Sequence, residues 1–222
     1  MTSGTIPTRR GFWPGWVLAN TLGYAVAFAA WVLLSQPLWP ALAGWLGGSA
    51  TLALFGAVLG LGASVAQALA LRWPLGRAAR WIAAATLAGA LGMVVGAWLS
   101  LWTMQAFPPV SNKYLTNICA NFAFGLPLGA SLGAARWLVT RGDRRARRWI
   151  PASMVAFTVA YGTAVGNSQI APPLPLLVLS AGFGAWVGAI AALIEWAWLR
   201  RRTFKPAPAA GDSGRASLQS RP

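Results

Sequence analysis

The stretch FGAVLGLGASVAQALALR at residues 55–72 decides the architecture of this chain, because the sequence repeats its pattern twice more. Residues 124–141 read FGLPLGASLGAARWLVTR, and residues 183–200 read FGAWVGAIAALIEWAWLR. Each copy begins with Phe-Gly and has a second glycine four residues later, a polar side chain seven residues after that, and an arginine five residues further on. Four aligned positions at constant spacing form a much stronger signal than one GxxxG pair, since glycine is common in membrane helices.

The residues ahead of each copy are also similar, although more loosely. A tryptophan followed by an aliphatic residue begins an apolar segment each time, at Trp16, Trp81 and Trp149. Near the far ends of these segments a glutamine is followed within three residues by proline, at Gln36, Gln105 and Gln169. The repeating unit is predicted to be a helical hairpin, present three times at about 14–72, 81–141 and 149–202.

The composition places these hairpins in a membrane. The 222 residues are 57% hydrophobic and 9% charged, whereas a soluble domain carries about a quarter charged residues. A helix needs about 20 mainly apolar residues to cross a bilayer. Six segments approach this length, the fifth with a few flanking residues: Gly15–Leu34, Ala50–Leu71, Trp81–Thr103, Ile118–Val139, Ile150–Val165 and Leu176–Leu199. We therefore predict an all-α polytopic membrane protein with six transmembrane helices.

The net charge of +15 follows the ends of these spans. Basic residues gather before the first span and after every second one, at Arg9, Arg10, Arg72, Arg77, Arg80, Arg141, Arg144, Arg145, Arg147, Arg148, Arg200, Arg201, Arg202 and Lys205, whereas the opposite loops contain only Lys113. Since Lys and Arg near span ends stay on the cytoplasmic side, both termini are predicted to be cytoplasmic. The charge therefore requires no nucleic-acid partner, and anionic membrane lipids remain candidate partners for the same clusters.

The chain divides into three parts. Residues 1–13 form a predicted cytoplasmic segment, residues 14–202 the six-helix membrane domain, and residues 203–222 a cytoplasmic tail rich in Pro, Ala, Gly and Ser that is predicted to be disordered. The start Thr8-Arg9-Arg10 resembles a twin-arginine export signal. The consistent charge bias of the later spans favours a retained first helix instead. Between the first two spans, Pro37–Gly48 is predicted to be an interfacial or re-entrant stretch on the outer face.

The glycines of the repeat predict where helices approach closely. Residues four apart share one helix face, and small residues on such a face allow two backbones to come together in a membrane. The faces expected to do this carry Gly56, Gly60, Gly125, Gly129, Gly133, Gly184 and Gly188. Two uses remain open for them: packing inside this one bundle, or docking of a partner subunit.

The polar position of the repeat predicts a layer near the cytoplasmic end. Gln67, Arg136 and Glu195 each precede an arginine by five residues, which places them about 7 Å inside the helix end. Asn20 and Ser153 follow their opening tryptophans by four residues and should lie at a similar depth. An ionisable residue within a span is a functional candidate whose partner should be named. Arg136 and Glu195 are the natural pair, either as a structural contact or as a cytoplasmic gate or substrate contact.

The tryptophans predict two aromatic belts at the membrane surfaces, where amphipathic rings are enriched. One belt is expected at the cytoplasmic ends, with Trp13, Trp16, Trp73, Trp81, Trp137, Trp149, Trp196 and Trp198. The other is expected toward the opposite face, with Trp31, Trp39, Trp45, Trp98 and Trp102.

The residue types needed for common catalytic chemistry are scarce. The chain has no histidine, one cysteine (Cys119), and three acidic residues (Asp143, Glu195 and Asp212). No nucleophile with a base, no set of metal ligands and no phosphate-binding loop is present in the sequence. We therefore predict a protein that is not an enzyme, with no catalytic residue, no metal-binding residue and no cofactor.

The repeated hairpin with Gly56, Gly60, Gln67 and Arg72 resembles a loose group of uncharacterised multi-spanning bacterial membrane proteins. Arg136 and Glu195 depart from the glutamine expected at that position of the pattern. The resemblance implies a bacterial plasma membrane location and no specific activity.

Two functional hypotheses remain. The first is a non-enzymatic structural or accessory subunit that assembles through its glycine faces with a membrane-protein partner or with copies of itself. The second is a small transporter or channel that uses the polar layer.

Overall fold

The structure, a computed structural model, describes residues 12–106, 113–140, 144–168 and 176–200. It contains the helices α1 (Phe12–Ala70), α2 (Leu75–Ala106), α3 (Lys113–Val139), α4 (Trp149–Ser168) and α5 (Leu176–Arg200), with a short 3-10 helix, η1 (Arg144–Arg148), before α4. The predicted all-α class is confirmed, since these residues contain no strand. The N-terminal segment 1–11 and the tail 203–222 lie outside the described residues.

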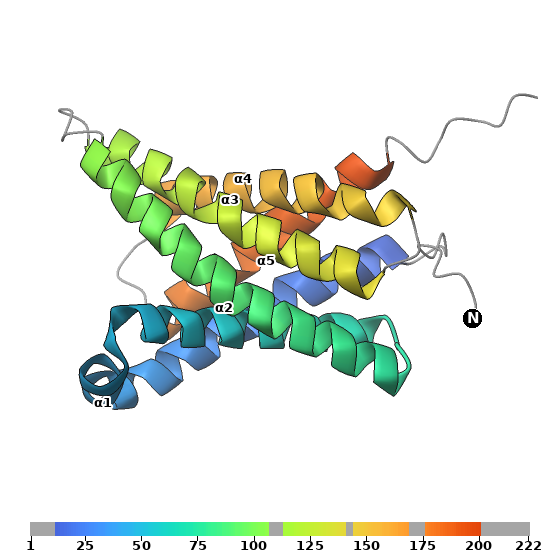
Figure 1. Cartoon of the computed structure of the whole chain (residues 1–222), viewed down its shortest axis with the longest axis horizontal. Helices are drawn as coiled ribbons and strands as arrows, with labels where there is room; N and C mark the ends of the chain where they lie inside the picture. Colours follow the sequence, from blue (N-terminus) through green and yellow to red (C-terminus); the bar gives the residue numbers. More distant parts are fainter. Residues whose placement is uncertain (1–11, 107–112, 141–143, 169–175, 201–222) are drawn as a thin grey trace, which may run out of the picture.

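The long helix α1 contains two antiparallel arms, residues 12–35 and 48–70 (Figure 1). A straight helix of 59 residues would be about 90 Å long. Instead, a Cβ added to Gly23 would lie 2.7 Å from the Cα of Ala63, so the two arms pack against each other. The backbone is helical through Pro37 and Pro40, where the sequence predicts a break, and the chain reverses there nevertheless. The side chains of residues 36–47 lie outside the described part.

The helices form a closed ring of neighbours. In chain order α1 contacts α2, α2 contacts α3, α3 contacts α4 and α4 contacts α5, and α5 returns to contact α1. The beginning of α1, the turn from α1 to α2, the α3–α4 connection and the end of α5 lie at one end of the bundle (Figure 1). Two basic residues therefore share that end: Arg77 in the first turn of α2 and Arg148 in η1, directly before α4.

Five helical segments are long and apolar enough to cross a membrane: Phe12–Ser35, Gly48–Ala70, Leu75–Ala106, Leu115–Val139 and Leu177–Trp198. They agree with five of the six predicted spans. The predicted span at 150–165 falls on α4, which is a helix of 20 residues but is not one of the five. A sixth crossing therefore remains a prediction.

The outer surface of the bundle is apolar, as in a membrane protein, and several polar side chains are buried inside it. On the first arm of α1, Leu18, Leu22 and Val26 follow one another at four-residue spacing and are each more than half exposed. Asn20 on the same arm is fully buried. In lipid the outer Leu and Val side chains meet a solvent as apolar as themselves, so burying them brings no hydrophobic gain.

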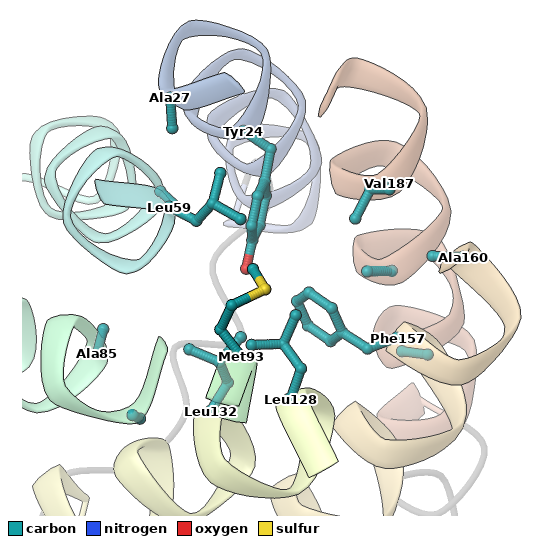
Figure 2. Packing of buried hydrophobic residues seen from close by; sticks show 14 of the residues in the cluster. Tyr24, Ala27, Leu59, Ala85, Met93, Leu128, Leu132, Phe157, Ala160 and Val187 are labelled. Carbon is teal, nitrogen blue, oxygen red and sulfur yellow. The ribbon is translucent and has the colours of Figure 1, made fainter. Parts of the chain in front are cut away.

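The centre of the bundle is filled by apolar and aromatic side chains (Figure 2). Leu59, Leu128 and Val187 each lie three residues after the first glycine of a copy, and all three are less than 2% exposed. They meet at the centre with Tyr24, Met93 and Phe157, which come from the helices between them. The bundle axis is therefore packed at this level.

The glycine pairs pack against the backbone of the next helix in the ring. A Cβ added to Gly56 or Gly60 would lie 2.7–2.8 Å from the carbonyl carbon of Gly89 or Ala85 in α2. No real Cβ accepts such a distance without movement. A Cβ added to Gly125 or Gly129 would lie equally close to the carbonyl carbon of Phe157 or Ser153 in α4. The same holds for Gly184 and Gly188 with the carbonyl carbons of Tyr24 and Asn20 in α1.

These contacts correct one of the two uses predicted for the glycine faces. Gly133 also faces the α4 backbone, where its added Cβ would lie 2.7 Å from the Cα of Ile150. All seven of the predicted packing glycines are thus occupied within the chain and are not available to a partner subunit. The physical reason is that small residues act wherever two backbones approach, and the fold brings its own helices together first.

The turn after α1 ends the helix in a Schellman arrangement. Trp73 N–H donates to the Ala68 carbonyl at 3.1 Å, and Arg72 N–H donates to the Leu69 carbonyl at 3.1 Å. Arg72 has a φ of 49°, in the left-handed region where glycine is preferred at this position. An arginine here therefore holds a strained backbone conformation at the surface.

Candidate functional site

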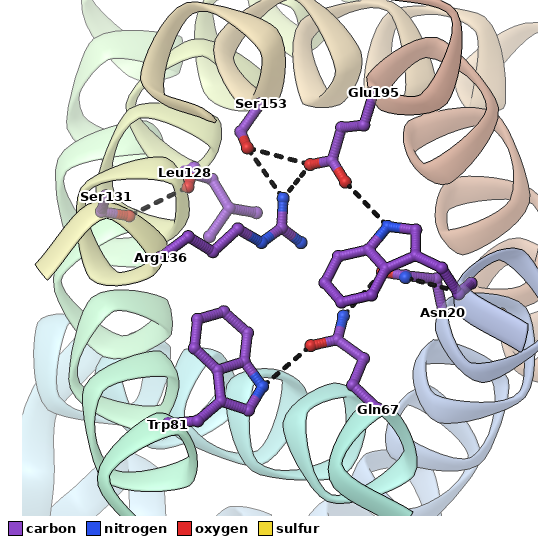
Figure 3. Close-up of polar contacts among 9 residues, drawn as sticks. Asn20, Gln67, Trp81, Leu128, Ser131, Arg136, Ser153 and Glu195 are labelled. Carbon is purple, nitrogen blue, oxygen red and sulfur yellow. Dashed lines mark hydrogen bonds and ion pairs between the residues drawn. The ribbon is translucent and has the colours of Figure 1, made fainter. Parts of the chain in front are cut away.

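The five residues of the predicted polar layer lie together inside the bundle, near its basic end (Figure 3). All of them are buried, and Arg136 is the most exposed at 4%. Gln67 comes from the second arm of α1, Arg136 from α3 and Glu195 from α5, and their side chains point toward one another. Asn20 and Ser153, from the first arm of α1 and from α4, complete the set.

One half of the layer is a chain of neutral hydrogen bonds. Asn20 Nδ2 donates to the Trp16 carbonyl at 2.8 Å, and Gln67 Nε2 donates to Asn20 Oδ1 at 3.0 Å. Trp81 Nε1 then donates to Gln67 Oε1 at 3.0 Å. Each amide thus uses a donor and its carbonyl oxygen, which is what a buried amide requires.

The other half is an ion pair with a hydroxyl beside it. Arg136 Nη1 donates to Glu195 Oε1 and, at 2.8 Å, to Ser153 Oγ. Ser153 Oγ lies 2.9 Å from the same carboxylate oxygen, to which it donates. Trp16 Nε1 donates to the second oxygen, Glu195 Oε2, at 3.2 Å. Both carboxylate oxygens therefore have partners, and the charge of Glu195 is balanced by Arg136.

Three tryptophans surround the Arg136 guanidinium. Its central carbon lies 5.0 Å from the Trp16 ring centroid, 5.1 Å from that of Trp149 and 5.8 Å from that of Trp81. These distances are within the range of cation–π attraction, which is strongest for tryptophan and for sites removed from water. The cation is thus held by one carboxylate and three aromatic rings.

These tryptophans correct the predicted cytoplasmic belt. Trp16, Trp81 and Trp149 are only 2%, 3% and 5% exposed, so they face the interior and not the membrane surface. Asn20 and Ser153 of the layer lie four residues after Trp16 and Trp149, and Ala85 stands at the equivalent position after Trp81. Four residues is one helical turn on the same face, and this spacing is the signal that could have assigned them to the layer.

The layer contains no histidine and no cysteine. Among the described residues there is no group of three His, Cys, Asp or Glu side chains that could hold a metal ion. Glu195 is the only acidic side chain in the layer, and its partners are an arginine, a serine and a tryptophan. The hydrogen bonding of the ion pair is incomplete, because Arg136 Nε is buried without a hydrogen-bond partner.

Comparisons of the chain with protein families, with curated proteins and with solved structures find no match. The geometry of the bundle and of its polar layer therefore carries the functional argument.

Proposed function

We propose that the chain is a non-enzymatic integral membrane protein of a bacterial plasma membrane, acting as a structural or accessory subunit. The proposal includes six membrane crossings, three hairpin copies around a pseudo-threefold axis, and both termini in the cytoplasm. The contacts from each glycine pair to the next helix support the threefold arrangement, since equivalent residues of all three copies make them. The arginines gathered at one end of the bundle support the orientation.

The observation that carries the proposal is the packed centre of the bundle. A solute pathway along the axis would need a polar, hydrated passage. In its place lie Leu59, Leu128 and Val187 together with Tyr24 and Phe157, all of them buried. A bundle with a packed apolar centre and an exposed apolar exterior is suited to stable contacts with lipid and with other membrane proteins.

The glycine faces serve internal packing, so the proposed contacts with a partner use the outward faces. On α2, Leu87, Leu91 and Val95 form such a face, each of them more than half exposed. Trp98 and Trp102 continue it toward the end of α2, and both are about two-thirds exposed. These side chains suit the acyl chains of lipids as well as the apolar helices of a partner or of a second copy.

Purification in mild detergent tests the subunit proposal. We expect the protein to elute with a mass larger than one protomer plus detergent, in a fixed stoichiometry that native mass spectrometry resolves. A matched sample carrying Leu87→Ser and Leu91→Ser should keep its helicity and lose part of that assembly. A stable monomer with nothing attached in several detergents and in lipid nanodiscs would contradict the proposal.

The alternative function is a small transporter or channel gated at the cytoplasmic end. The observation that favours it is the buried Arg136–Glu195 pair, because ionisable pairs inside membrane helices frequently mark ion or substrate pathways. Exchanging both residues together, as Arg136→Gln with Glu195→Gln, removes the charges and leaves the neutral layer. Unchanged assembly together with unchanged cellular function in that double variant would contradict the gate.

A further inference from the structure

We propose that Trp16, Trp81, Trp149 and Glu195 form a recognition site for guanidinium and related organic cations, which the chain's own Arg136 occupies in this structure. We refer to these four residues as the cation cage. The proposal goes beyond the subunit function and does not depend on it, because it concerns only which chemical group this part of the bundle selects.

The walls of the cage have the chemistry that selects an organic cation. Three indole rings and one carboxylate are the groups that recognise a delocalised organic cation, because each ring face is negative and the carboxylate supplies the opposite charge. Here they converge on a single guanidinium, with ring centroids 5.0–5.8 Å from its central carbon. Helices α1, α2, α4 and α5 each contribute one wall.

Hydrogen bonds that do not involve Arg136 hold three of the walls. Trp81 is held by Gln67 at 3.0 Å, and the Glu195 carboxylate is held by Ser153 at 2.9 Å and by Trp16 at 3.2 Å. Trp16 is oriented by the same bond to Glu195. These bonds do not depend on the arginine, so they keep the walls oriented toward an incoming cation, which would supply the charge that the buried Glu195 then lacks.

Arg136 is an imperfect and separable occupant of the cage. Its Nε is buried without a partner, so a free guanidinium could satisfy donors that the tethered one cannot. Arg136 belongs to α3, which contains Pro127 in its interior and so lacks one backbone hydrogen bond upstream of the cage. None of the four walls lies on α3, so the occupant and its cage are on different elements.

The test uses the purified full chain in detergent, with Arg136→Ala to empty the cage and methylguanidinium chloride as the probe. Urea is the neutral analogue of nearly the same shape, and sodium chloride controls for ionic strength. We expect saturable methylguanidinium binding to Arg136→Ala, followed by tryptophan fluorescence and by a rise in the unfolding temperature. Binding to the wild-type chain should be at least tenfold weaker, because its own arginine competes.

Two further variants locate the binding. Arg136→Ala with Glu195→Gln should bind methylguanidinium at least tenfold more weakly than Arg136→Ala alone, since the anionic wall is lost. Arg80→Ala removes an exposed arginine outside the layer and should behave as the wild type. Equal affinity of the single and double variants, or an equal effect of urea, would overturn the proposal.

A variant that fails to fold still decides the question. If Arg136→Ala is recovered only as aggregate, its purification is repeated with methylguanidinium, urea or sodium chloride present throughout. Recovery of monodisperse helical protein with methylguanidinium alone supports the cage. Recovery that is the same in all three solutions, or absent from all three, counts against it.

Discussion

The Arg136–Glu195 pair combines two buried charges whose separate removal from water would be very costly. Burial of an ion pair is tolerated when further hydrogen bonds satisfy its remaining atoms. Ser153 and Trp16 do so for the carboxylate, while three tryptophan rings surround the guanidinium. Such a pair adds little net stability over an apolar core, yet breaking it leaves one uncompensated charge.

Glu195→Gln is therefore expected to destabilise the protein by about 3–5 kcal/mol, because it leaves the Arg136 guanidinium buried and unpaired. Adding Arg136→Gln should recover a large part of that loss, since both side chains are then neutral. The measurement is resistance to unfolding in a denaturant titration of the detergent-solubilised protein. With Arg136→Gln as the third variant, a loss of stability in the double variant equal to the sum of the two single losses would show that the two residues are not coupled.

Arg72 offers a second prediction, at the turn that follows α1. Its φ of 49° suits glycine, so Arg72→Gly is expected to stabilise the protein by about 1 kcal/mol relative to Arg72→Ala. Arg72→Ala is the matched control because it removes the same charge and keeps the strained backbone. Thermal unfolding of the two variants in one detergent compares them directly. Equal unfolding temperatures for the alanine and glycine variants would contradict backbone strain at position 72.

At the scale of helices, the glycine pairs determine how closely neighbouring elements approach. Each pair replaces side-chain packing by backbone contact. At Gly184 and Gly188, for example, an added Cβ would lie only 2.7 Å from the carbonyl carbons of Tyr24 and Asn20. In a membrane such close packing supplies van der Waals contact that the hydrophobic effect does not provide. This contact closes the ring, because α5 is thereby held against α1.

Two glycines of α5 allow a matched test of this packing. Gly184→Ala is expected to destabilise the bundle by about 1–3 kcal/mol, since its new methyl group overlaps the Tyr24 backbone. Gly182→Ala should be neutral or stabilising by up to about 1 kcal/mol, because nothing lies within 4 Å of the added Cβ and alanine favours the helix. The unfolding temperatures of the two variants measure the difference, and equal temperatures would show that α5 does not pack as described.

At the scale of the whole molecule, the two ends of the bundle differ in charge. The beginnings of α2 and α4 lie at one end, with Arg77 in the first turn of α2 and Arg148 in η1 directly before α4, and α2 leads from that end to the other, with Gln105 in its last turn. This asymmetry is the basis for the proposed orientation.

A cysteine-labelling experiment tests the orientation. In a Cys119→Ala background, Gln105→Cys is expected to react with a membrane-impermeant maleimide on intact spheroplasts, whereas Arg80→Cys should react only after lysis. Both positions are exposed in the structure, so a cysteine that does not react is shielded by the membrane and not by the fold of the protein. The reverse pattern would place the basic end outside.

Much of the layer could be predicted from the sequence, whereas its tryptophan walls share the helical spacing of the layer and are equally compatible with a place at the membrane surface. Gln67, Arg136 and Glu195 occupy one position of a repeat, so equal depth follows from equal spacing. Trp16 lies at the end of a span, where tryptophan is common both at the interface and inside a bundle. The rotation of its helix decides between the two, and that rotation depends on the neighbouring helices.

The sequence by itself determined the helices, the membrane environment, the position of the basic ends and the depth of the polar residues. These follow from properties that are local along the chain: apolar length, residue spacing and charge. Only the tertiary structure decided that the glycine faces are used internally, that α5 closes the ring on α1, and that Arg136 lies among three tryptophans. The physical reason is that lipid is as apolar as the helix surfaces, so hydrophobicity does not mark which face turns inward, and backbone contact and hydrogen bonds between distant residues make that choice.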